Sequence, residues 1–259
     1  MRLFLSIALL LVFPLNVIAV DIKYAGCVTI QENLLKEAKT VYEKKTGNRV
    51  GLSGGGAGAG IRAVLSGLVD IGGVSRPLRP DEISQGLVSY TVGYTAVAVV
   101  VHRDIPVDNL TTRNLKDILS GKIKNWKELG GPDIPVKVVI PSKGYASRDE
   151  CERIIMEKER FTEDAVITPE QTLCETVDGI PGSIGIVDTS MLDPKRVKVV
   201  RLEGLLPERS NIRSGKYRLV IPINLVTKGE ASGVVKEFID FILSPEGQSI
   251  VEKRFVGVR

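Results

Sequence analysis

Three loops rich in glycine and hydroxyl residues carry the groups that could hold a small anion. They span residues 26–29, 54–60 and 142–147, and each precedes a predicted helix. An oxyanion needs hydrogen-bond donors at fixed positions, and helix N-termini supply backbone N–H groups together with a partial positive charge. Glycine lets the backbone approach a ligand closely. Any one of these loops alone is typical of a helix-capping turn, but three of them facing one cleft predict an oxyanion site.

A hydroxyl and a guanidinium follow at the end of another predicted strand, at Ser75 and Arg76. A guanidinium can form a fork of two hydrogen bonds to an oxyanion. The alternative for Arg76 is a surface salt bridge.

Cys27 could act as a nucleophile, because a thiolate is stabilised at the start of a helix. Such an enzyme also needs a base, and the single histidine, His102, follows an apolar run at the end of a predicted strand. One histidine supports no convincing hydrolytic triad. The cysteines Cys27, Cys151 and Cys174 match no zinc pattern. We therefore expect no enzyme, no metal and no cofactor. A Cys151–Cys174 disulfide and two buried free thiols remain equal alternatives.

The elements that must position these residues alternate between strand and helix. A helix is predicted over residues 31–46 and is closed by Gly47, and its apolar residues Leu34, Leu35, Ala38, Val41 and Tyr42 share one face. The other helices are expected at 61–67, 111–120, 148–159, 171–177 and 234–243, and strands at 22–25, 48–53, 70–73, 136–140 and 183–187. This order predicts an α/β fold with mainly parallel sheets flanked by helices.

Two long β-rich runs, 91–103 and 216–227, flank the middle third of the chain. We interpret them as crossings between two lobes, with the hinge near residues 94–102 and 216–226 and a cleft between the lobes. Lobe 1 then comprises residues 20–96 plus 223–259, and lobe 2 comprises residues 97–222.

The N-terminus has the layout of a secretory signal peptide. Arg2 precedes a run of apolar residues to Val20, and small residues allow cleavage near Ala19, so residues 1–19 are excluded from the fold. An uncleaved anchor and acylation at Cys27 are the alternatives, although Asp21 and Lys23 separate Cys27 from the apolar run. The mature protein is therefore expected to be periplasmic or extracellular, with membrane association left open.

The 259 residues carry a formal net charge of +4, with basic and acidic residues interspersed. The absence of basic blocks argues against a nucleic-acid surface, and mild basicity favours a small anionic ligand. We expect a monomer.

Four segments occur in the order of a known family: GLSGGGAGAGIR (51–62), VDIGGVSRPL (69–78), LKDILSGKIKNWKELGGP (115–132) and FIDFILSPEGQ (238–248). The chain resembles the phosphate-binding proteins of ABC importers, which have the type II periplasmic-binding fold. This resemblance implies that the protein captures a small inorganic anion, first of all phosphate, by closure of the lobes and delivers it to importer membrane subunits. Sulfate, molybdate, tungstate or a carboxylate as ligand, and a sensing role without transport, are the alternatives.

The loops and the resemblance together define the candidate anion-binding residues, with Lys143 and Arg148 as additional cations. They are Cys27, Val28, Thr29, Gly56, Ala57, Gly58, Ser75, Arg76, Gly144, Tyr145, Ala146 and Ser147. For Arg148, packing or pairing between the lobes is as consistent with its position as ligand contact.

The chain departs from the family at several of these positions. Cys27 and Ala57 stand where the family has serines, and Tyr145-Ala146 replaces a Ser-Gly pair. Pro141 replaces an arginine, which leaves Lys143 as the nearest cation, and Arg76 stands where some members have an aspartate. Each missing hydroxyl costs on the order of 1–3 kcal/mol of anion stabilisation. The sequence therefore predicts the fold and the class of ligand better than the ligand itself.

Overall fold

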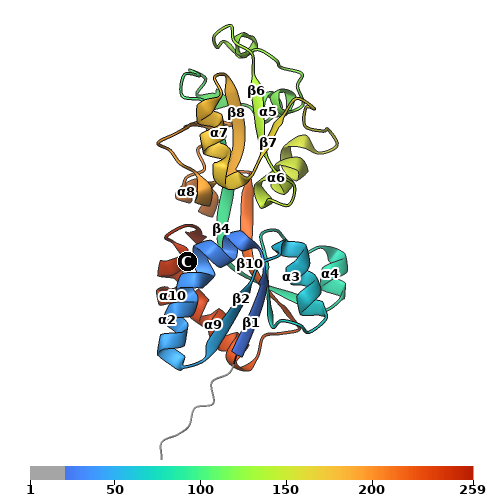
Figure 1. The fold of residues 1–259 in the computed structure, drawn as a ribbon, viewed down its shortest axis with the longest axis vertical. Helices are drawn as coiled ribbons and strands as arrows, with labels where there is room; N and C mark the ends of the chain where they lie inside the picture. Colours follow the sequence, from blue (N-terminus) through green and yellow to red (C-terminus); the bar gives the residue numbers. More distant parts are fainter. Residues whose placement is uncertain (1–20, 259) are drawn as a thin grey trace, which may run out of the picture.

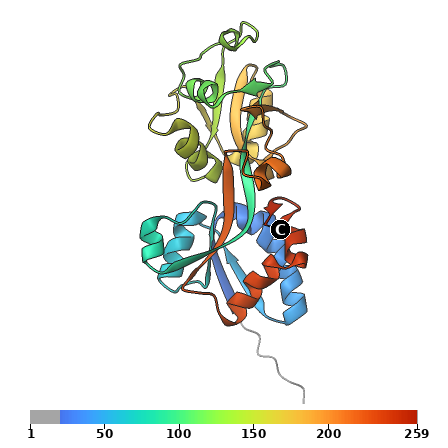
Figure 2. The ribbon, with the colours of Figure 1, turned by 180° about the vertical axis from the view of Figure 1, so that it is seen from behind.

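Two strands, β4 (Leu87–Val101) and β10 (Val220–Lys228), run side by side and connect two lobes (Figures 1 and 2). The computed structural model describes residues 21–258. Lobe 1 carries the N-terminal strand and the C-terminal helices, and lobe 2 is built from the middle of the chain. The predicted signal peptide and its cleavage near Ala19 lie outside the described residues. Within those residues, no helix is long and apolar enough to cross a membrane.

The sheet of lobe 1 has the strand order β2-β1-β3-β10-β4. Strand β1 (Asp21–Gly26) pairs in parallel with β2 (Arg49–Ser53) and β3 (Ile71–Val74), and β10 is antiparallel to both of its neighbours. In lobe 2 the order is β4-β8-β6-β7, and β6 (Lys137–Pro141) pairs in parallel with β7 (Val166–Thr168) and β8 (Ser183–Asp188). The predicted two-lobed α/β fold is confirmed, with parallel pairing among β1, β2 and β3 and among β6, β7 and β8, and antiparallel pairing at β4 and β10.

Helices flank these sheets, as Figure 1 shows. The strands outside the two orders given above are β5 (Asn109–Leu110), β9 (Lys198–Leu202) and β11 (Val256–Gly257). The α-helices are α1 (Val28–Ile30), α2 (Lys36–Thr46), α3 (Gly56–Leu65), α4 (Pro80–Ser84), α5 (Thr112–Leu119), α6 (Ala146–Cys151), α7 (Leu173–Gly179), α8 (Arg209–Arg213), α9 (Gly233–Leu243) and α10 (Pro245–Val251). Shorter 3₁₀ or π segments are η1 (Gln31–Leu35), η2 (Trp126–Leu129), η3 (Glu152–Met156), η4 (Glu170–Thr172) and η5 (Thr189–Met191).

Strand β4 changes its hydrogen-bonding partner where it leaves lobe 1. Its residues up to Ala96 pair with β10, and from Val97 to Val101 it pairs with β8. The register with β10 shifts beside Ile223 and Asn224, which marks a β-bulge in the part that lies in lobe 1. The two lobes are therefore joined through the backbone ladder of one continuous strand.

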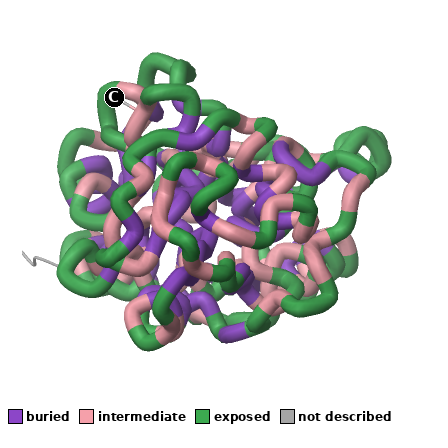
Figure 3. The backbone as a smooth tube through the Cα atoms, turned by 90° about the horizontal axis from the view of Figure 1, so that it is seen from above, coloured by how far each residue is buried: buried purple, intermediate pink, exposed green. Residues whose placement is uncertain are grey.

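Each lobe has its own apolar core, and Figure 3 shows the buried residues gathered in the interior. In lobe 1, Tyr42 packs edge-on against Phe238 with ring centroids 5.0 Å apart. In lobe 2, Trp126 is fully buried, and its indole N–H donates to the Gly182 carbonyl oxygen at 2.8 Å. A buried indole N–H must find an acceptor, so this bond also fixes the turn before β8.

The three helices that follow the glycine and hydroxyl loops begin earlier than the sequence predicts. The first helical run starts at Val28 instead of residue 31, the second at Gly56 instead of 61, and the third at Ala146 instead of 148. Glycine at Gly56 and the β-branched residues Val28 and Thr29 have low helix propensity, so the sequence gives weak helix signals at the first two starts. At Gly60, a Cβ would lie only 2.7 Å from the Ala25 carbonyl oxygen, so glycine is required for α3 to pack on β1.

The cysteine alternatives are resolved in favour of free thiols. Cys151 is buried in the core on one face of the lobe 2 sheet, with Val97 and Val99 of β4. Cys174 packs with Ala98 and Val100 on the other face. Because successive strand residues point to opposite faces, the sheet separates the two thiols and no Cys151–Cys174 disulfide forms.

Candidate anion-binding cleft

A cleft of about 680 Å³ lies between the lobes, and its lining comes from both of them. Lobe 1 contributes Cys27, Val28, Thr29, Glu32, Asn33, Gly55, Gly56, Ala57, Ser75 and Arg76. Lobe 2 contributes Lys143, Gly144, Tyr145, Ala146, Asp149, Gln171 and Met191. Eleven of the residues predicted from the sequence are therefore brought together in one cleft.

The lobe 1 wall contains the beginnings of two helical runs. Cys27 is the N-cap residue of the run that continues from α1 through η1 to the end of α2, and its own N–H donates to the Gly73 carbonyl oxygen at 3.0 Å. Gly55 precedes α3 with a φ of 128°, a backbone conformation that favours glycine. The first N–H groups of a helix have no partner within it, so both starts offer donors to a ligand in the cleft.

The thiol of Cys27 accepts a hydrogen bond from the Ser75 hydroxyl at 3.1 Å. The Tyr24 hydroxyl donates to the Cys27 carbonyl oxygen at 3.0 Å, so the backbone of Cys27 is held as well as its side chain. Burial, and to a smaller extent the Cys27 thiol, raises the pKa of Tyr24, so the phenol stays a neutral donor. The position of Cys27 is therefore fixed by β1, β3 and the first helical turn together.

Arg76 lines the cleft, but its guanidinium is already engaged. Its two terminal nitrogens donate to the Glu82 carboxylate at 2.7 and 2.8 Å, and one of them also reaches the Pro77 carbonyl oxygen. The hydrogen bond to Glu82 raises the pKa of Arg76 and lowers the pKa of Glu82. The fork expected for an anion is made with Glu82, so Arg76 offers the cleft a partly neutralised charge.

The lobe 2 wall contains the start of the helical run formed by α6 and η3. Tyr145 is its N-cap residue, and the Tyr145 hydroxyl donates to the Gln171 side-chain oxygen at 2.7 Å. Lys143 is exposed beside it and brings a positive charge to this wall. Gly144 has a φ of 93°, which lets the loop turn into the helix.

Three expected site residues do not line the cleft: Gly58, Ser147 and Arg148. Ser147 is fully buried, and its hydroxyl donates to the Glu170 carboxylate. Arg148 donates to the Pro141 carbonyl oxygen at 2.9 Å and to Glu152 at 2.9 Å, and it stacks over Phe161. Of the alternatives for Arg148, packing within lobe 2 is what the structure shows.

Six lining residues were not predicted from the sequence: Glu32, Asn33, Gly55, Asp149, Gln171 and Met191. Asp149 matters most for chemistry, because an ionised carboxylate can only accept hydrogen bonds. Loss of hydration raises its pKa, as does Glu152 to a smaller extent, whereas Arg148 and Arg76 act in the opposite direction. The influence of Arg76 reaches Asp149 across the cleft from the opposite lobe.

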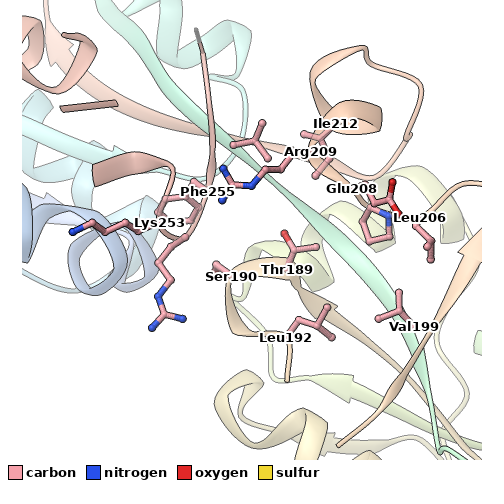
Figure 4. A pocket seen from close by; sticks show the side chains of 13 residues that line it. Thr189, Ser190, Leu192, Val199, Leu206, Glu208, Arg209, Ile212, Lys253 and Phe255 are labelled. Atoms are coloured by element: carbon pink, nitrogen blue, oxygen red, sulfur yellow. The ribbon is translucent and has the colours of Figure 1, made fainter. Parts of the chain in front are cut away.

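A second cavity of about 400 Å³ lies beside η5 and the crossing strand β4 (Figure 4). Arg209 extends toward Phe255 in this view, and its guanidinium is paired with the carboxylate of Glu252 at 3.1 Å. Glu208, the N-cap residue of α8, also lines this cavity. A carboxylate at the helix start disfavours an anion there, so the cleft between the lobes remains the candidate site.

Sequence comparison extends this structural picture. The profile of the PBP superfamily domain matches residues 19–246 of the chain. The phosphate-binding protein PstS of Bacillus subtilis is 30% identical over 233 residues, which cover 88% of this chain and 76% of that protein. The chain belongs to the PstS-like family. PstS of Borreliella burgdorferi is 27% identical and covers 92% of this chain and 90% of that protein.

Solved structures of PstS-like proteins have the same fold. A putative phosphate ABC transporter substrate-binding protein with bound phosphate from Clostridium perfringens has a TM-score of 0.81, with 31% identity and coverage of 92% of this chain and 100% of that one. An ABC-type phosphate transport receptor from Vibrio cholerae has a TM-score of 0.81 at 25% identity, covering 90% of this chain and 98% of that one. These PstS-like proteins are binding proteins and not enzymes.

Proposed function

We propose that this protein captures inorganic phosphate in the cleft between its lobes and delivers it to an ABC importer. The PstS-like relatives are named for phosphate binding, and one solved relative contains phosphate. The alternatives, another anion as ligand and a sensing role without transport, use the same cleft, and the experiment below separates phosphate from the other anions.

One observation carries the proposal: helix beginnings from both lobes line a single cleft. The runs that begin at Val28 and Gly56 belong to lobe 1, and the run that begins at Ala146 belongs to lobe 2. An anion that receives donors from both lobes makes contacts in the closed form that are absent in an open one. It therefore shifts the population toward closure.

Backbone N–H groups supply most of the proposed phosphate contacts. They come from Val28, Thr29, Gly56, Ala57 and Ala146, with side-chain hydroxyls from Thr29 and Ser75. Val28 is apolar and exposed, so only its backbone can contribute. Lys143 and the partly neutralised Arg76 provide positive charge.

Gly58, Ser147 and Arg148 act indirectly in this proposal. Gly58 belongs to α3, Ser147 holds Glu170, and Arg148 braces the loop through Pro141.

Export is common to PstS-like substrate-binding proteins, and it agrees with the signal peptide expected at residues 1–19. We extend the proposal to a monomer in the periplasm or outside the cell whose closed form docks on importer membrane subunits. The lobe boundaries at 96/97 and 222/223 form part of the same proposal, and the hinge lies where β4 changes partner.

Thermal unfolding of ligand-stripped protein tests the ligand. The panel contains phosphate, sulfate, molybdate, tungstate and carboxylates. A ligand that binds only the folded state stabilises it by about 4 kcal/mol at a thousandfold excess over its dissociation constant. We expect the largest rise in midpoint with phosphate. A larger rise with another anion, or none with any, would overturn the proposal.

A further inference from the structure

Two carboxyl groups lie buried next to each other behind the lobe 2 wall of the cleft. Glu170, the first residue of η4, is 2% exposed, and Asp188, the last residue of β8, is 3% exposed. Neither side chain lines the cleft, and the proposed binding chemistry uses neither of them. A buried carboxyl is costly unless it is hydrogen-bonded or neutral, so this pair calls for a role.

Glu170 holds the first turn of the helix that begins at the cleft. Its Oε1 atom accepts hydrogen bonds from the Ser147 hydroxyl and, at 2.8 Å, from the backbone N–H of Asp188. Ser147 directly follows Ala146, which lines the cleft. On the other side, Gln171 follows Glu170 and also lines the cleft. The Glu170 carboxyl therefore binds a residue that is adjacent in sequence to one lining residue, Ala146, and Glu170 is itself adjacent in sequence to another, Gln171.

Asp188 continues the network toward the hinge and lobe 1. It accepts from the Thr95 hydroxyl of β4 at 2.5 Å and from the backbone N–H of Ser190 at 2.8 Å. The Asn33 side chain of lobe 1 reaches the Ser190 hydroxyl at 3.5 Å. The buried pair thus connects the lobe 2 anion loop, a crossing strand and the opposite lobe.

The groups that face Glu170 leave its charge uncompensated. Strand β8 presents Asp188, α7 presents the Cys174 thiol, and α6 presents the neutral Ser147 hydroxyl. Arg148 of α6 turns away to Pro141 and Glu152. Burial first, and then Asp188, raises the pKa of Glu170 to about 7, and burial raises the pKa of Asp188. Two adjacent buried carboxylates cannot both ionise cheaply, so the pair tends to hold a proton.

An anion bound at the start of α6 would add a third negative charge to this region. We propose that Glu170 is a positioning residue for the lobe 2 anion loop and that it takes up a proton from solvent when the anion is captured. The proton joins Oε2 of Glu170, because Oε1 already accepts two hydrogen bonds, and no bond to the ligand forms or breaks. This inference rests on the proposed function, because it needs an anion in the cleft.

Calorimetric titration with inorganic phosphate measures this proton uptake. Titrations at pH 7 in two buffers of different ionisation enthalpy give the number of protons taken up per phosphate bound. Glu170→Gln keeps an acceptor oxygen for Ser147 and Asp188 but cannot ionise, and Glu175→Gln removes one exposed carboxylate from the neighbouring helix as a matched control. Phosphate's own protonation is common to all three proteins, so the difference between them reports Glu170.

Glu170, with a pKa of about 7, is only partly protonated at pH 7, so we expect the unmodified protein and Glu175→Gln to take up more protons per phosphate than Glu170→Gln, with about half a proton as the upper limit. A purely structural role for Glu170 would change the affinity without changing the proton count. Equal proton counts in all three proteins, or the same decrease in both variants, would overturn the inference while leaving phosphate capture intact. No phosphate binding by the unmodified protein would overturn the proposed function, and the inference with it.

Discussion

The Ser75 hydroxyl donates a hydrogen bond to the Cys27 sulfur across the ends of β3 and β1, at the wall where the proposed phosphate contacts lobe 1. The sulfur stands where the family has a serine oxygen. In this chain the thiol serves as the acceptor for the Ser75 hydroxyl. A thiol is, however, a weak donor toward an oxyanion.

Cys27→Ser is therefore expected to strengthen phosphate binding. A restored hydroxyl donor is worth on the order of 1 kcal/mol or more, which corresponds to a dissociation constant lower by about fivefold or more. Calorimetric titration measures the change. Cys27→Ala is the matched control, because it removes the sulfur without adding a donor, and it should not strengthen binding. An unchanged or weaker affinity in Cys27→Ser would show that position 27 does not donate to the ligand.

Asp149→Asn should reduce the preference for phosphate over sulfate. An ionised Asp149 can accept a hydrogen bond from a protonated oxyanion but repels one that carries no proton, whereas an asparagine can donate to either. We expect the affinity for sulfate to rise by about tenfold relative to phosphate. Competition titrations with both anions measure the ratio, and Asp164→Asn, an exposed position in lobe 2 away from the cleft, is the control. A constant ratio in Asp149→Asn would remove this residue from the specificity mechanism.

Glu82→Ala should destabilise lobe 1. The Glu82 side chain is 2% exposed and accepts the fork of Arg76 as well as the backbone N–H of Arg79. Removing one partner of a largely buried ion pair leaves the other uncompensated, so we expect a loss of about 3 kcal/mol in the free energy of unfolding. Urea denaturation measures the loss. The neighbouring Asp81→Ala, which removes an exposed ion pair, should cost less than about 1 kcal/mol.

The Arg76–Glu82 ion pair also affects how the stability of the folded protein changes at low pH. The hydrogen bond from Arg76 lowers the pKa of Glu82, so its stabilising contribution is complete above the ordinary glutamate pKa and is lost as the pH falls through the lowered value. The unmodified protein should therefore lose stability on acidification below about pH 4 more steeply than Glu82→Gln. Parallel slopes for the two proteins would contradict the assignment.

Glu170 should have the opposite effect: its contribution to the stability of the folded protein should be lost as the pH rises. Its pKa is raised from 4.5 to about 7 in the fold, so the folded state binds more protons than the unfolded state between these values. Stability of the ligand-free protein should then decrease by roughly 3 kcal/mol as the pH rises from 4.5 to 7. Glu170→Gln should show a smaller decrease and Glu175→Gln the full one, as measured by urea denaturation across this range. Identical pH profiles for all three proteins would refute a raised pKa at Glu170.

The sequence predicts the lobes and most of the lining because both rest on local signals. The apolar run in β4 and the glycine loops at Gly56 and Gly144 are visible without coordinates. Two features that change the chemistry of the site are not visible in the sequence: the pairing of Arg76 with Glu82, and the directions in which Ser147 and Asp149 point. Arg76 and Glu82 are six residues apart, but nothing in their spacing shows that the guanidinium turns to Glu82 instead of the cleft.

The burial of Ser147 and the exposure of Asp149 to the cleft likewise depend on tertiary structure. Both belong to the first turns of one helix, yet Ser147 points to Glu170 in the interior and Asp149 lines the cleft. Where that helix begins decides which side chain faces the ligand. The helix starts at residue 146 instead of 148, so both Ser147 and Asp149 are helical. Successive helical residues point about 100° apart, so these two side chains face different sides of the helix.

The order of the strands in lobe 1 also has a consequence for the newly made chain. Strand β10 lies between β3 and β4, but it is synthesised only after the whole of lobe 2. Until it arrives, β3 has an open edge that can pair with other chains. Asn224 of β10 then donates to the Arg76 carbonyl oxygen at 2.8 Å, and so fixes the residue beside Ser75. A prematurely terminated product that lacks β10 would retain a nearly complete lobe 2 but could not assemble the ligand wall of lobe 1, so only finished molecules can compete for phosphate.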